Sequence, residues 1–205
     1  MDWVEPKDRA ECLLVDDPLT LFESWLDEAR AAEGVGAEAL AVATATSAGE
    51  PSVRMVLLKG FDEHGFVFFT NYSSRKGAEL EQNPRAALLF HWPVLGRQVR
   101  VEGPVTRVTR EESEAYAHAR PRQSQLSALA SPQSRPVPDR DWLERRVEEL
   151  DREHPGAELP VREDWGGYRV APEAWEFWQH RDNRLHDRHR YEKAAGGWRV
   201  ERLAP

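Results

Sequence analysis

The apolar residues near the start of the chain recur at helical spacing. Asp17 can cap a helix that has Pro18 at its first position, and Phe22 and Trp25 fall on one face of that helix. This pattern predicts an amphipathic helix over residues 17–33, ended by the glycines that follow it.

Residues 1–16 show no periodic pattern, and we interpret them as a flexible N-terminal arm. From residue 38 onward, short β-rich runs alternate with turns that contain Gly, Pro or Asp, which predicts antiparallel strands. The expected strands are residues 40–46, 52–59, 66–71, 86–92, 97–108, 168–170, 174–179, 185–191 and 198–203. Further helices are expected at residues 74–82, 110–119 and 139–153, with a long loop at residues 121–138. Residues 17–205 are thus expected to form a single domain, mainly β with flanking helices, and an antiparallel β-barrel fits this pattern best.

Composition narrows the possible settings and partners of the chain. The chain has 205 residues, of which 40% are hydrophobic and 31% charged, and no apolar run approaches the ~18 residues that would span a bilayer. A formal net charge of -8 argues against nucleic acid as a partner. The first residues do not form an export signal, and the single cysteine, Cys12, fits a reducing compartment. We therefore expect a cytoplasmic protein that binds neither nucleic acid nor membranes.

The clearest candidate for chemistry is an anion site at the start of the helix expected over residues 74–82. Ser74 can cap this helix, and Arg75 and Lys76 follow in its first turn. Cations oppose the helix dipole at this end unless an anion is present, so the pattern favours a phosphate. A solvated turn is the alternative.

Further cations lie on an expected strand and in two segments beyond it. Alternation places Arg54 on one strand face with Val56, and Lys59 on the other face. Tyr116 and the segments 120–124 and 131–135 add Arg, Ser and Gln donors suited to phosphoryl oxygens. Charges that reach into solvent and plain polar loops remain the alternatives.

A final cationic row falls near the C-terminus. If residues 185–191 and the residue before them form a strand, Arg184, His186 and Arg188 share one face, and Leu185 points the other way into packing. Such a row must face solvent or a site, and nearby Trp and Phe residues suit a flat-ring ligand. His186 and His189 would face opposite sides of the strand, so no metal site is expected.

Motifs in the same order as in a known family run from about Asp17 to the last residue. They are Arg54-Met-Val-Leu-Leu-Lys59, Phe68-Phe-Thr-Asn71, Ser74-Arg75-Lys76, Asn83-Pro84-Arg85, Gly96-Arg97-Gln98-Val99, Arg120-Pro-Arg-Gln-Ser-Gln125, Pro132-Gln133-Ser134-Arg135, Trp165-Gly-Gly-Tyr-Arg169, Glu176-Phe-Trp178, Arg184-Leu-His-Asp-Arg188 and Arg202-Leu-Ala-Pro205. Together they resemble the pyridoxamine 5'-phosphate oxidase family.

The resemblance implies an FMN-binding split β-barrel that forms a homodimer with FMN at the subunit interface. The residues that would bind FMN are Arg54, Phe69, Thr70, Arg75, Lys76, Gln98, Gln133, Ser134, Trp178 and Arg188. Those that would bind the substrate phosphate are Lys59, Tyr116, Arg120 and Ser124. Arg184 and His186 would flank the substrate ring as the catalytic residues.

The implied reaction is the oxidation of a phosphorylated B6 vitamer, pyridoxamine or pyridoxine 5'-phosphate, to pyridoxal 5'-phosphate. Hydride passes to the flavin, and dioxygen reoxidises it with release of hydrogen peroxide. Arg184 would orient the ring and stabilise developing charge, and His186 would hydrogen-bond or move a proton.

The chain departs from the family pattern at three places. No Arg-x-x-Tyr pair precedes Asp17, His180-Arg181 stands where the family commonly has Gly, and Leu129 falls where it often has Trp. A related FMN oxidase of secondary metabolism, acting on a reduced aromatic as in the phenazine pathway, is therefore the first alternative. A flavin-binding module or vitamin-phosphate carrier without turnover is the second.

Overall fold

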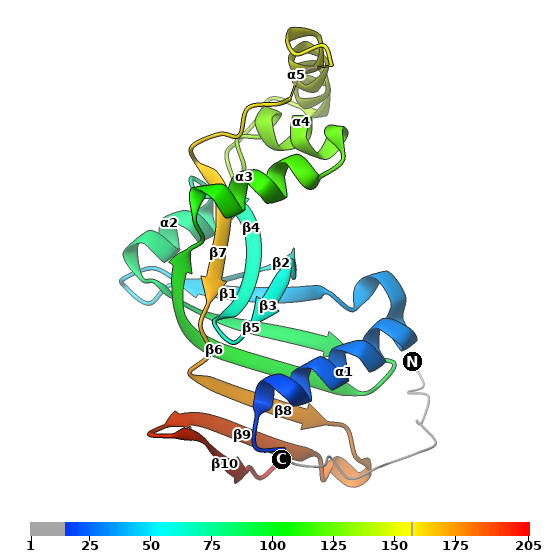
Figure 1. The fold of residues 1–205 in the computed structure, drawn as a ribbon, viewed down its shortest axis with the longest axis vertical. Helices are drawn as coiled ribbons and strands as arrows, with labels where there is room; N and C mark the ends of the chain where they lie inside the picture. Colours follow the sequence, from blue (N-terminus) through cyan, green and yellow to red (C-terminus); the bar gives the residue numbers. More distant parts are fainter. Residues whose placement is uncertain (1–14, 157) are drawn as a thin grey trace.

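The computed structural model of the chain describes residues 15–156 and 158–205, so most of the expected N-terminal arm lies outside the described residues. Ten strands form one antiparallel sheet that curls into a half-barrel (Figure 1). The strands are β1 (Ala39–Ala45), β2 (Pro51–Leu57), β3 (Gly60–Asp62), β4 (Gly65–Asn71), β5 (Arg85–Trp92), β6 (Arg97–Arg107), β7 (Trp165–Val170), β8 (Ala174–Gln179), β9 (Asp187–Ala194) and β10 (Gly197–Arg202). The α-helices are α1 (Pro18–Glu33), α2 (Arg75–Gln82), α3 (Arg110–Ala119), α4 (Arg122–Ala130) and α5 (Arg140–Glu153). The expected fold class, mainly β with flanking helices, is confirmed.

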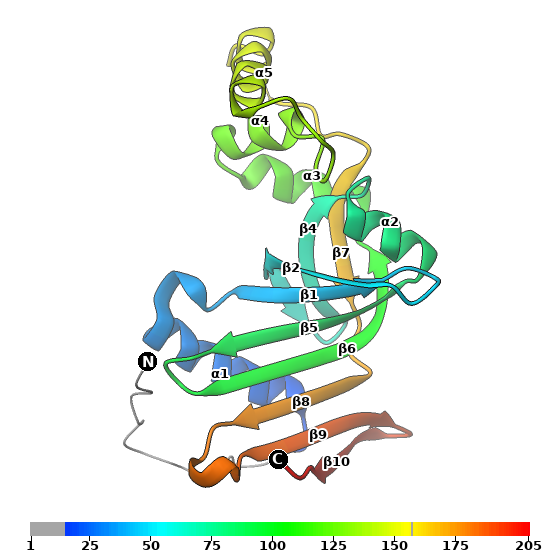
Figure 2. The same cartoon turned by 180° about the vertical axis from the view of Figure 1, so that it is seen from behind.

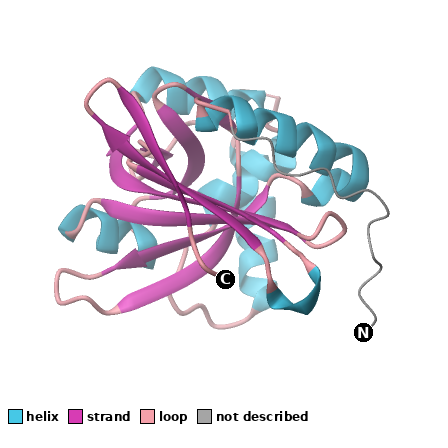
Figure 3. Ribbon diagram, turned by 90° about the horizontal axis from the view of Figure 1, so that it is seen from below, coloured by secondary structure: helices cyan, strands magenta, loops and turns pink. Residues whose placement is uncertain are grey.

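Strand β6 joins the two parts of the sheet. The main strand order is β10-β9-β8-β6-β5-β1-β2, and β7 connects β6 to β4, which pairs in turn with β3. The first half of β6, Arg97–Glu102, pairs with β8, whereas Val105–Arg107 pairs with β7. One strand therefore takes part in both parts of the curled sheet, and the resulting twist is visible in Figure 3.

Helix α1 fills the hollow of the half-barrel. The Asp17 carboxylate accepts hydrogen bonds from the backbone amides of Leu19 and Thr20, so this helix begins where the sequence predicts. Phe22 is fully buried, and its ring centroid lies 4.9 Å from those of Phe66 and Phe90. These edge-on ring contacts fix the helix across the sheet.

Helices α3, α4 and α5 form an excursion between β6 and β7 that projects from the sheet (Figures 1 and 2). The prediction of a loop over residues 121–138 is wrong for its first half, because α4 occupies residues 122–130. Leu126 and Ala130 of α4 are buried against Leu150 of α5 in a small separate core. Too few apolar residues carry this contact to produce a periodic signal in the sequence.

The prediction of a strand beginning at Leu185 is also wrong. Residues Asp182–Arg184 form a 3-10 turn, and β9 begins only at Asp187. Asn183 and Arg184 adopt φ angles of 56° and 62°, which an extended strand cannot contain. Leu185 is 70% exposed and does not point into packing. The short strand β3 was not predicted either.

No helix of the described residues is long and apolar enough to cross a membrane.

Candidate functional site

A cavity of about 650 Å³ opens between β2, β4 and the helices α2, α3 and α4. The predicted site residues that line it are Lys59, Phe69, Thr70, Lys76, Tyr116, Arg120, Ser124 and Gln133. These residues come from segments up to 74 positions apart in the sequence, from Lys59 to Gln133. The fold thus brings four of the ten predicted cofactor residues and the whole predicted substrate-phosphate set to one cavity. Asn71 and Trp165 also line the cavity but were not predicted as site residues.

Lys76 is a buried cation at the first turn of α2. The residue is only 7% exposed, and its Nζ donates to Thr70 Oγ1 at 2.8 Å and to Gln133 Oε1 at 2.9 Å. Ser74 caps the helix by accepting from the Gly77 amide, as predicted. Burial, and then the nearby positive charge of Arg54, lower the pKa of Lys76 to about 8. An anion beside this ammonium would restore the stability of its charged form.

A buried glutamate holds the two arginines beside Lys76. Glu79 of α2 is 3% exposed, and Oε1 accepts from Arg75 Nε at 2.8 Å while Oε2 accepts from Arg54 Nη2 at 3.3 Å. The hydroxyls of Thr44 and Ser52 also donate to Oε2. Burial alone would raise the pKa of Glu79, but these hydrogen bonds outweigh burial and hold it at about 2. Arg54, Arg75, Lys76 and Glu79 are called the cation cluster below.

The alternation predicted for β2 explains why Arg54 reaches this cluster. Arg54 and Val56 are half-buried, whereas Val53, Met55 and Leu57 on the other face are 67%, 65% and 48% exposed. Lys59 lies beyond the end of β2, where its amide donates to Val67 O at 2.9 Å. The strand therefore turns the face with Arg54 inward, toward the cluster, and leaves its other, apolar face exposed.

An aromatic stack forms one wall of the cavity. The rings of Phe69 and Tyr116 are stacked with centroids 4.0 Å apart, and Trp165 lies 5.6 Å from Phe69 on a nearly parallel plane. Lys59 Nζ lies 6.0 Å from the Tyr116 centroid, and the Arg120 guanidinium lies 5.3 Å from that of Trp165. Two cations therefore lie close to the stacked rings of this wall.

Trp165 could have been found from its sequence context. It begins the Trp-Gly-Gly run at the start of β7. A Cβ atom on Gly167 would lie 2.9 Å from a ring carbon of Phe69, so the stack depends on glycine at this position. The glycines that follow Trp165 mark a close approach between backbone and ring.

A second group of predicted residues lies across β6, β8 and β9. Gln98, Trp178 and Arg188 are directly opposite one another in the strand register. Arg188 Nε donates to Glu176 Oε1 at 2.8 Å, and Arg188 Nη1 donates to Ala204 O at 2.8 Å. Glu176 is 6% exposed and also accepts from Arg100. The row is therefore held by the sheet and by one buried carboxylate.

His186 lies in the short connection between the 3-10 turn and β9. Its ring centroid is 4.6 Å from that of Trp178 and 5.1 Å from that of His180, and its Nδ1 accepts from the Arg181 amide at 3.1 Å. Burial, His180 and then Arg184 lower the pKa of His186, which favours the neutral ring with its proton on Nε2. Arg184 is exposed at the end of the turn. The interpretation of Arg184, His186 and Arg188 as one strand face is therefore wrong, because only Arg188 belongs to the strand.

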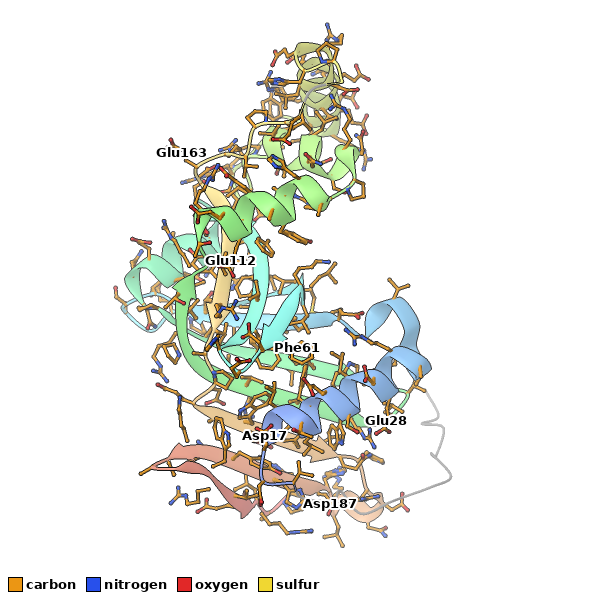
Figure 4. All side chains as sticks on the ribbon, viewed as in Figure 1. Asp17, Glu28, Phe61, Glu112, Glu163 and Asp187 are labelled. Atoms are coloured by element: carbon orange, nitrogen blue, oxygen red, sulfur yellow. The ribbon has the colours of Figure 1, made fainter. Side chains whose placement is uncertain are left out.

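One copy of the chain keeps these two groups apart. None of Gln98, Trp178, Arg184, His186 and Arg188 lines the main cavity, and β2 and β9 are separated in the strand order by β1, β5, β6 and β8. Figure 4 shows the same separation, with Glu112 of α3 near the middle of the molecule and Asp187 at the start of β9 near its lower end. We call the cavity with its cation cluster the cavity half, and Gln98, Trp178, Arg184, His186 and Arg188 the β8–β9 half. Ser134, with a φ of 68°, is exposed on the loop that follows α4.

No set of three or more His, Cys, Asp or Glu side chains within residues 15–156 and 158–205 is placed to hold a metal ion. The donors that the structure gathers in the cavity half are instead Arg, Lys, Ser, Thr and Gln. These groups bind oxyanions rather than cations.

Two family models match the chain, and together they cover most of it. The one described as "Pyridoxamine 5'-phosphate oxidase" matches residues 26–153, which include the cavity half apart from Trp165. The one described as "Pyridoxine 5'-phosphate oxidase C-terminal dimerisation region" matches residues 165–205, which include most of the β8–β9 half.

Curated relatives carry closely related names. A pyridoxine/pyridoxamine 5'-phosphate oxidase from Rubrobacter xylanophilus is 56% identical over 189 residues, covering 92% of this chain and 87% of its own length. One from Granulibacter bethesdensis is 49% identical over 209 residues, covering 100% of this chain and 98% of its own length.

Solved structures share the fold. PhzG from Burkholderia lata 383, in complex with tetrahydrophenazine-1-carboxylic acid, superimposes with a TM-score of 0.88 at 34% identity, covering 93% of this chain and 94% of that one. An FMN-binding protein related to pyridoxamine 5'-phosphate oxidase, from Nostoc punctiforme PCC 73102, has a TM-score of 0.71 at 20% identity, covering 95% of this chain and 100% of its own.

Proposed function

Because the chain belongs to the pyridoxamine 5'-phosphate oxidase family, we propose that it oxidises pyridoxamine or pyridoxine 5'-phosphate to pyridoxal 5'-phosphate with FMN as cofactor. Dioxygen is the acceptor and hydrogen peroxide the product. The observation that carries the proposal is a cavity that meets cations at two separate places. Lys76 of the cation cluster lines it at α2, and Lys59 and Arg120 line it at the aromatic wall. A flavin phosphate and a substrate phosphate require two such places.

The cation cluster fits the phosphate of FMN. Arg54, Arg75 and Lys76 surround a single carboxylate, that of Glu79, so the cluster has an excess of positive charge. Ser74 and the free amides of the first turn of α2 add neutral donors. A phosphate monoester, which is close to doubly charged at neutral pH, supplies the missing negative charge. Phe69, Thr70, Gln133 and Ser134 complete the proposed cofactor contacts on this side.

Lys59, Tyr116, Arg120 and Ser124 are the proposed contacts of the substrate phosphate. All four line the same cavity, and Tyr116 belongs to the aromatic stack. Arg120 and Ser124 lie at the start of α4, where a helix N-terminus also favours an anion. A flat pyridine ring can then lie beside the stacked rings while its phosphate contacts the two cations.

A second copy of the chain supplies the β8–β9 half in this proposal. The family model that matches residues 165–205 is described as a dimerisation region, and the β8–β9 half is absent from the cavity of its own chain. Val53, Met55 and Leu57 give the outer face of β2 an exposed apolar surface next to the cavity. FMN then lies at the subunit interface, where Gln98, Trp178 and Arg188 of the second copy contact it.

The two catalytic residues act on the substrate ring from this second copy. FMN held at this site would supply the redox chemistry, which is uptake of a hydride equivalent from the substrate and transfer of its electrons to dioxygen. Arg184, which is exposed, orients the ring and stabilises negative charge that develops on it. The lowered pKa of His186 favours its neutral form, in which the Nε2 proton is available for a hydrogen bond to the substrate.

Anaerobic mixing of the purified protein with pyridoxamine 5'-phosphate tests this function. The protein should be yellow, release FMN on denaturation and lose its flavin colour on mixing, and admission of air should restore the colour with formation of peroxide. Unphosphorylated pyridoxamine should react at least ~10²-fold less efficiently in kcat/KM, because the cations at the aromatic wall then stay unpaired. A colourless protein that also fails to bind added FMN would contradict the proposal.

The second candidate is oxidation of a reduced aromatic without a phosphate. The 34% identical PhzG structure contains tetrahydrophenazine-1-carboxylic acid, which favours this possibility. Equal activity on pyridoxamine and its phosphate, together with turnover of a reduced phenazine carboxylate, would support it. Binding of flavin with no colour loss for either substrate would instead indicate a carrier without turnover.

A further inference from the structure

We propose that Glu79 is a positioning residue of the cofactor-phosphate site, which holds the Arg54 and Arg75 guanidiniums in place before FMN binds. This inference rests on the function proposed above, because it assumes that the cation cluster binds the FMN phosphate. It concerns a residue that neither lines the cavity nor belongs to the predicted site.

The contacts of Glu79 link three elements of the fold. Its two carboxylate oxygens accept from Arg75 on its own helix and from Arg54 on β2, while Thr44 on β1 adds a hydroxyl donor. Thr44 and Ser52 also accept hydrogen bonds from Arg54, so both hydroxyls bridge the arginine and the carboxylate. Glu79 therefore fixes Arg54 in two ways, directly and through these hydroxyls.

The arrangement leaves Arg75 free to bind an anion. Arg75 uses only Nε for Glu79, and its side chain remains 63% exposed, whereas that of Glu79 is 4% exposed. A guanidinium held at one nitrogen can present its two terminal nitrogens to a phosphate in a fork. Without Glu79, the Arg75 side chain would become ordered only when the ligand binds, at a cost in conformational entropy.

The positive charges around Glu79 also favour a carboxylate at this position. Arg75 and Lys76 lie in the first turn of α2, where cations oppose the helix dipole, and Arg54 lowers the pKa of Lys76. The Glu79 charge offsets this repulsion in the ligand-free protein without contacting the ligand itself. Removal of the charge should therefore weaken the binding of FMN more than that of riboflavin. Riboflavin has no phosphate, so its affinity does not depend on the orientation of the arginines.

The experiment measures the affinity of flavin-free protein for FMN and for riboflavin by quenching of flavin fluorescence. Glu79→Gln keeps the size of the side chain and loses its charge. We expect it to weaken FMN by about 10- to 100-fold, the worth of one or more charged hydrogen bonds, and to change riboflavin by less than about twofold. Glu81→Gln is the matched control, because Glu81 lies on the same helix, is 70% exposed and pairs with Arg107. It should change neither affinity.

Two further variants keep the inference testable if Glu79→Gln does not fold. Thr44→Val removes the hydroxyl that bridges Arg54 and Glu79 while keeping the side-chain shape, and it should weaken FMN by about threefold and leave riboflavin unchanged. Glu79→Asp should recover part of the FMN affinity lost in Glu79→Gln, because it restores the charge.

The possible outcomes separate this inference from the proposed function. If the wild-type protein binds no FMN, the proposed function fails and the inference fails with it. If the wild-type protein binds FMN tightly but the variants keep the wild-type ratio of FMN to riboflavin affinity, Glu79 is only a structural ion pair and the inference alone is overturned.

Discussion

The cavity half and the β8–β9 half of the site are built in contrasting ways. In the cavity half, Lys76 and Glu79 are almost fully buried and their polar atoms have partners within the chain. In the β8–β9 half, Arg184 is exposed in a turn with a φ of 62°, and Leu185 beside it is 70% exposed. In the function proposed above, a single chain completes its anion site but leaves its ring-binding residues open to a partner. The proposal therefore implies that the cofactor-phosphate site forms on folding and the ring-binding site on assembly.

Mixing of two inactive variants gives the largest effect and tests whether the two halves act across chains. Arg184→Ala and the double variant Lys59→Ala/Arg120→Ala should each lower kcat/KM by at least ~10²-fold while FMN stays bound. After subunit exchange, about a quarter of the wild-type activity should return, because half of randomly formed dimers are mixed and each contains one intact site.

Each variant exchanged with itself is the control and should stay inactive. No recovery in the mixture, with exchange verified by mass spectrometry of the dimers, would place both halves within one chain. Release of FMN by Arg184→Ala would show that this residue contacts the cofactor rather than the substrate.

Removal of a cation from the cavity half should affect the cofactor instead of the substrate. Arg75→Ala should weaken FMN by about 1.5 kcal/mol, roughly tenfold, which is the low end for a charged hydrogen bond because the side chain is 63% exposed. Isothermal titration of flavin-free protein measures this. Arg85→Ala, an exposed arginine paired with Glu173, is the matched control and should leave FMN affinity unchanged. An unchanged affinity in Arg75→Ala would support a merely solvated turn.

The buried ammonium of Lys76 predicts a pH dependence. Its pKa is about 8 in the folded chain and 10.5 in the unfolded chain, so the unfolded chain binds more protons between these values. This group should therefore raise the free energy of unfolding of the flavin-free protein as the pH rises from 8 to 10.5, by up to about 3 kcal/mol. Affinity for FMN should fall over the lower part of this range, as the ammonium loses its proton.

Chemical denaturation across this pH range measures the free energy of unfolding. Lys76→Met is the control, because its free energy of unfolding should lack the rise with pH that Lys76 causes. Identical pH profiles for the two proteins would show that Lys76 keeps an ordinary pKa.

The smallest effect is expected in the β8–β9 half. His180 is one of the groups that lower the pKa of His186, so His180→Gly should raise that pKa. NMR titration of the His186 ring in the flavin-free protein measures the change. His118→Gln, a histidine of α3, is the control. A pKa of His186 that falls in His180→Gly would contradict the predicted repulsion between the rings.

The sequence predicts the regular parts of this molecule well, for identifiable reasons. The start of α1 follows from Asp17 and Pro18, and that of α2 from Ser74, because capping is encoded by adjacent residues. The alternation of Arg54 and Val56 against Met55 is also correct, because successive side chains of a strand point to opposite faces, of which one is half-buried and the other exposed. Most predicted strands agree with the structure within one or two residues.

The errors arise where contacts distant in the sequence decide the structure. Helix α4 is stabilised by a few apolar contacts with α5. The turn before β9 requires positive φ angles at Asn183 and Arg184. Glu79 belongs to no recognisable motif, and a glutamate in a short surface helix is usually solvated. The sequence therefore gives no sign that it is buried. Only the packing of β1 and β2 against α2 makes it a buried partner of two arginines.

The excursion from α3 to α5 has a consequence for how this protein can diverge. It leaves the sheet after β6 and returns at β7, and these strands are paired from Val105 opposite Val170 to Arg107 opposite Tyr168. Its two ends are thus held together whatever lies between them, and a change in the length of such a loop costs little entropy. Tyr116, Arg120 and Ser124 all lie within it. Mutation and selection can therefore remodel the proposed substrate contacts in this excursion while the sheet and the cation cluster are inherited unchanged.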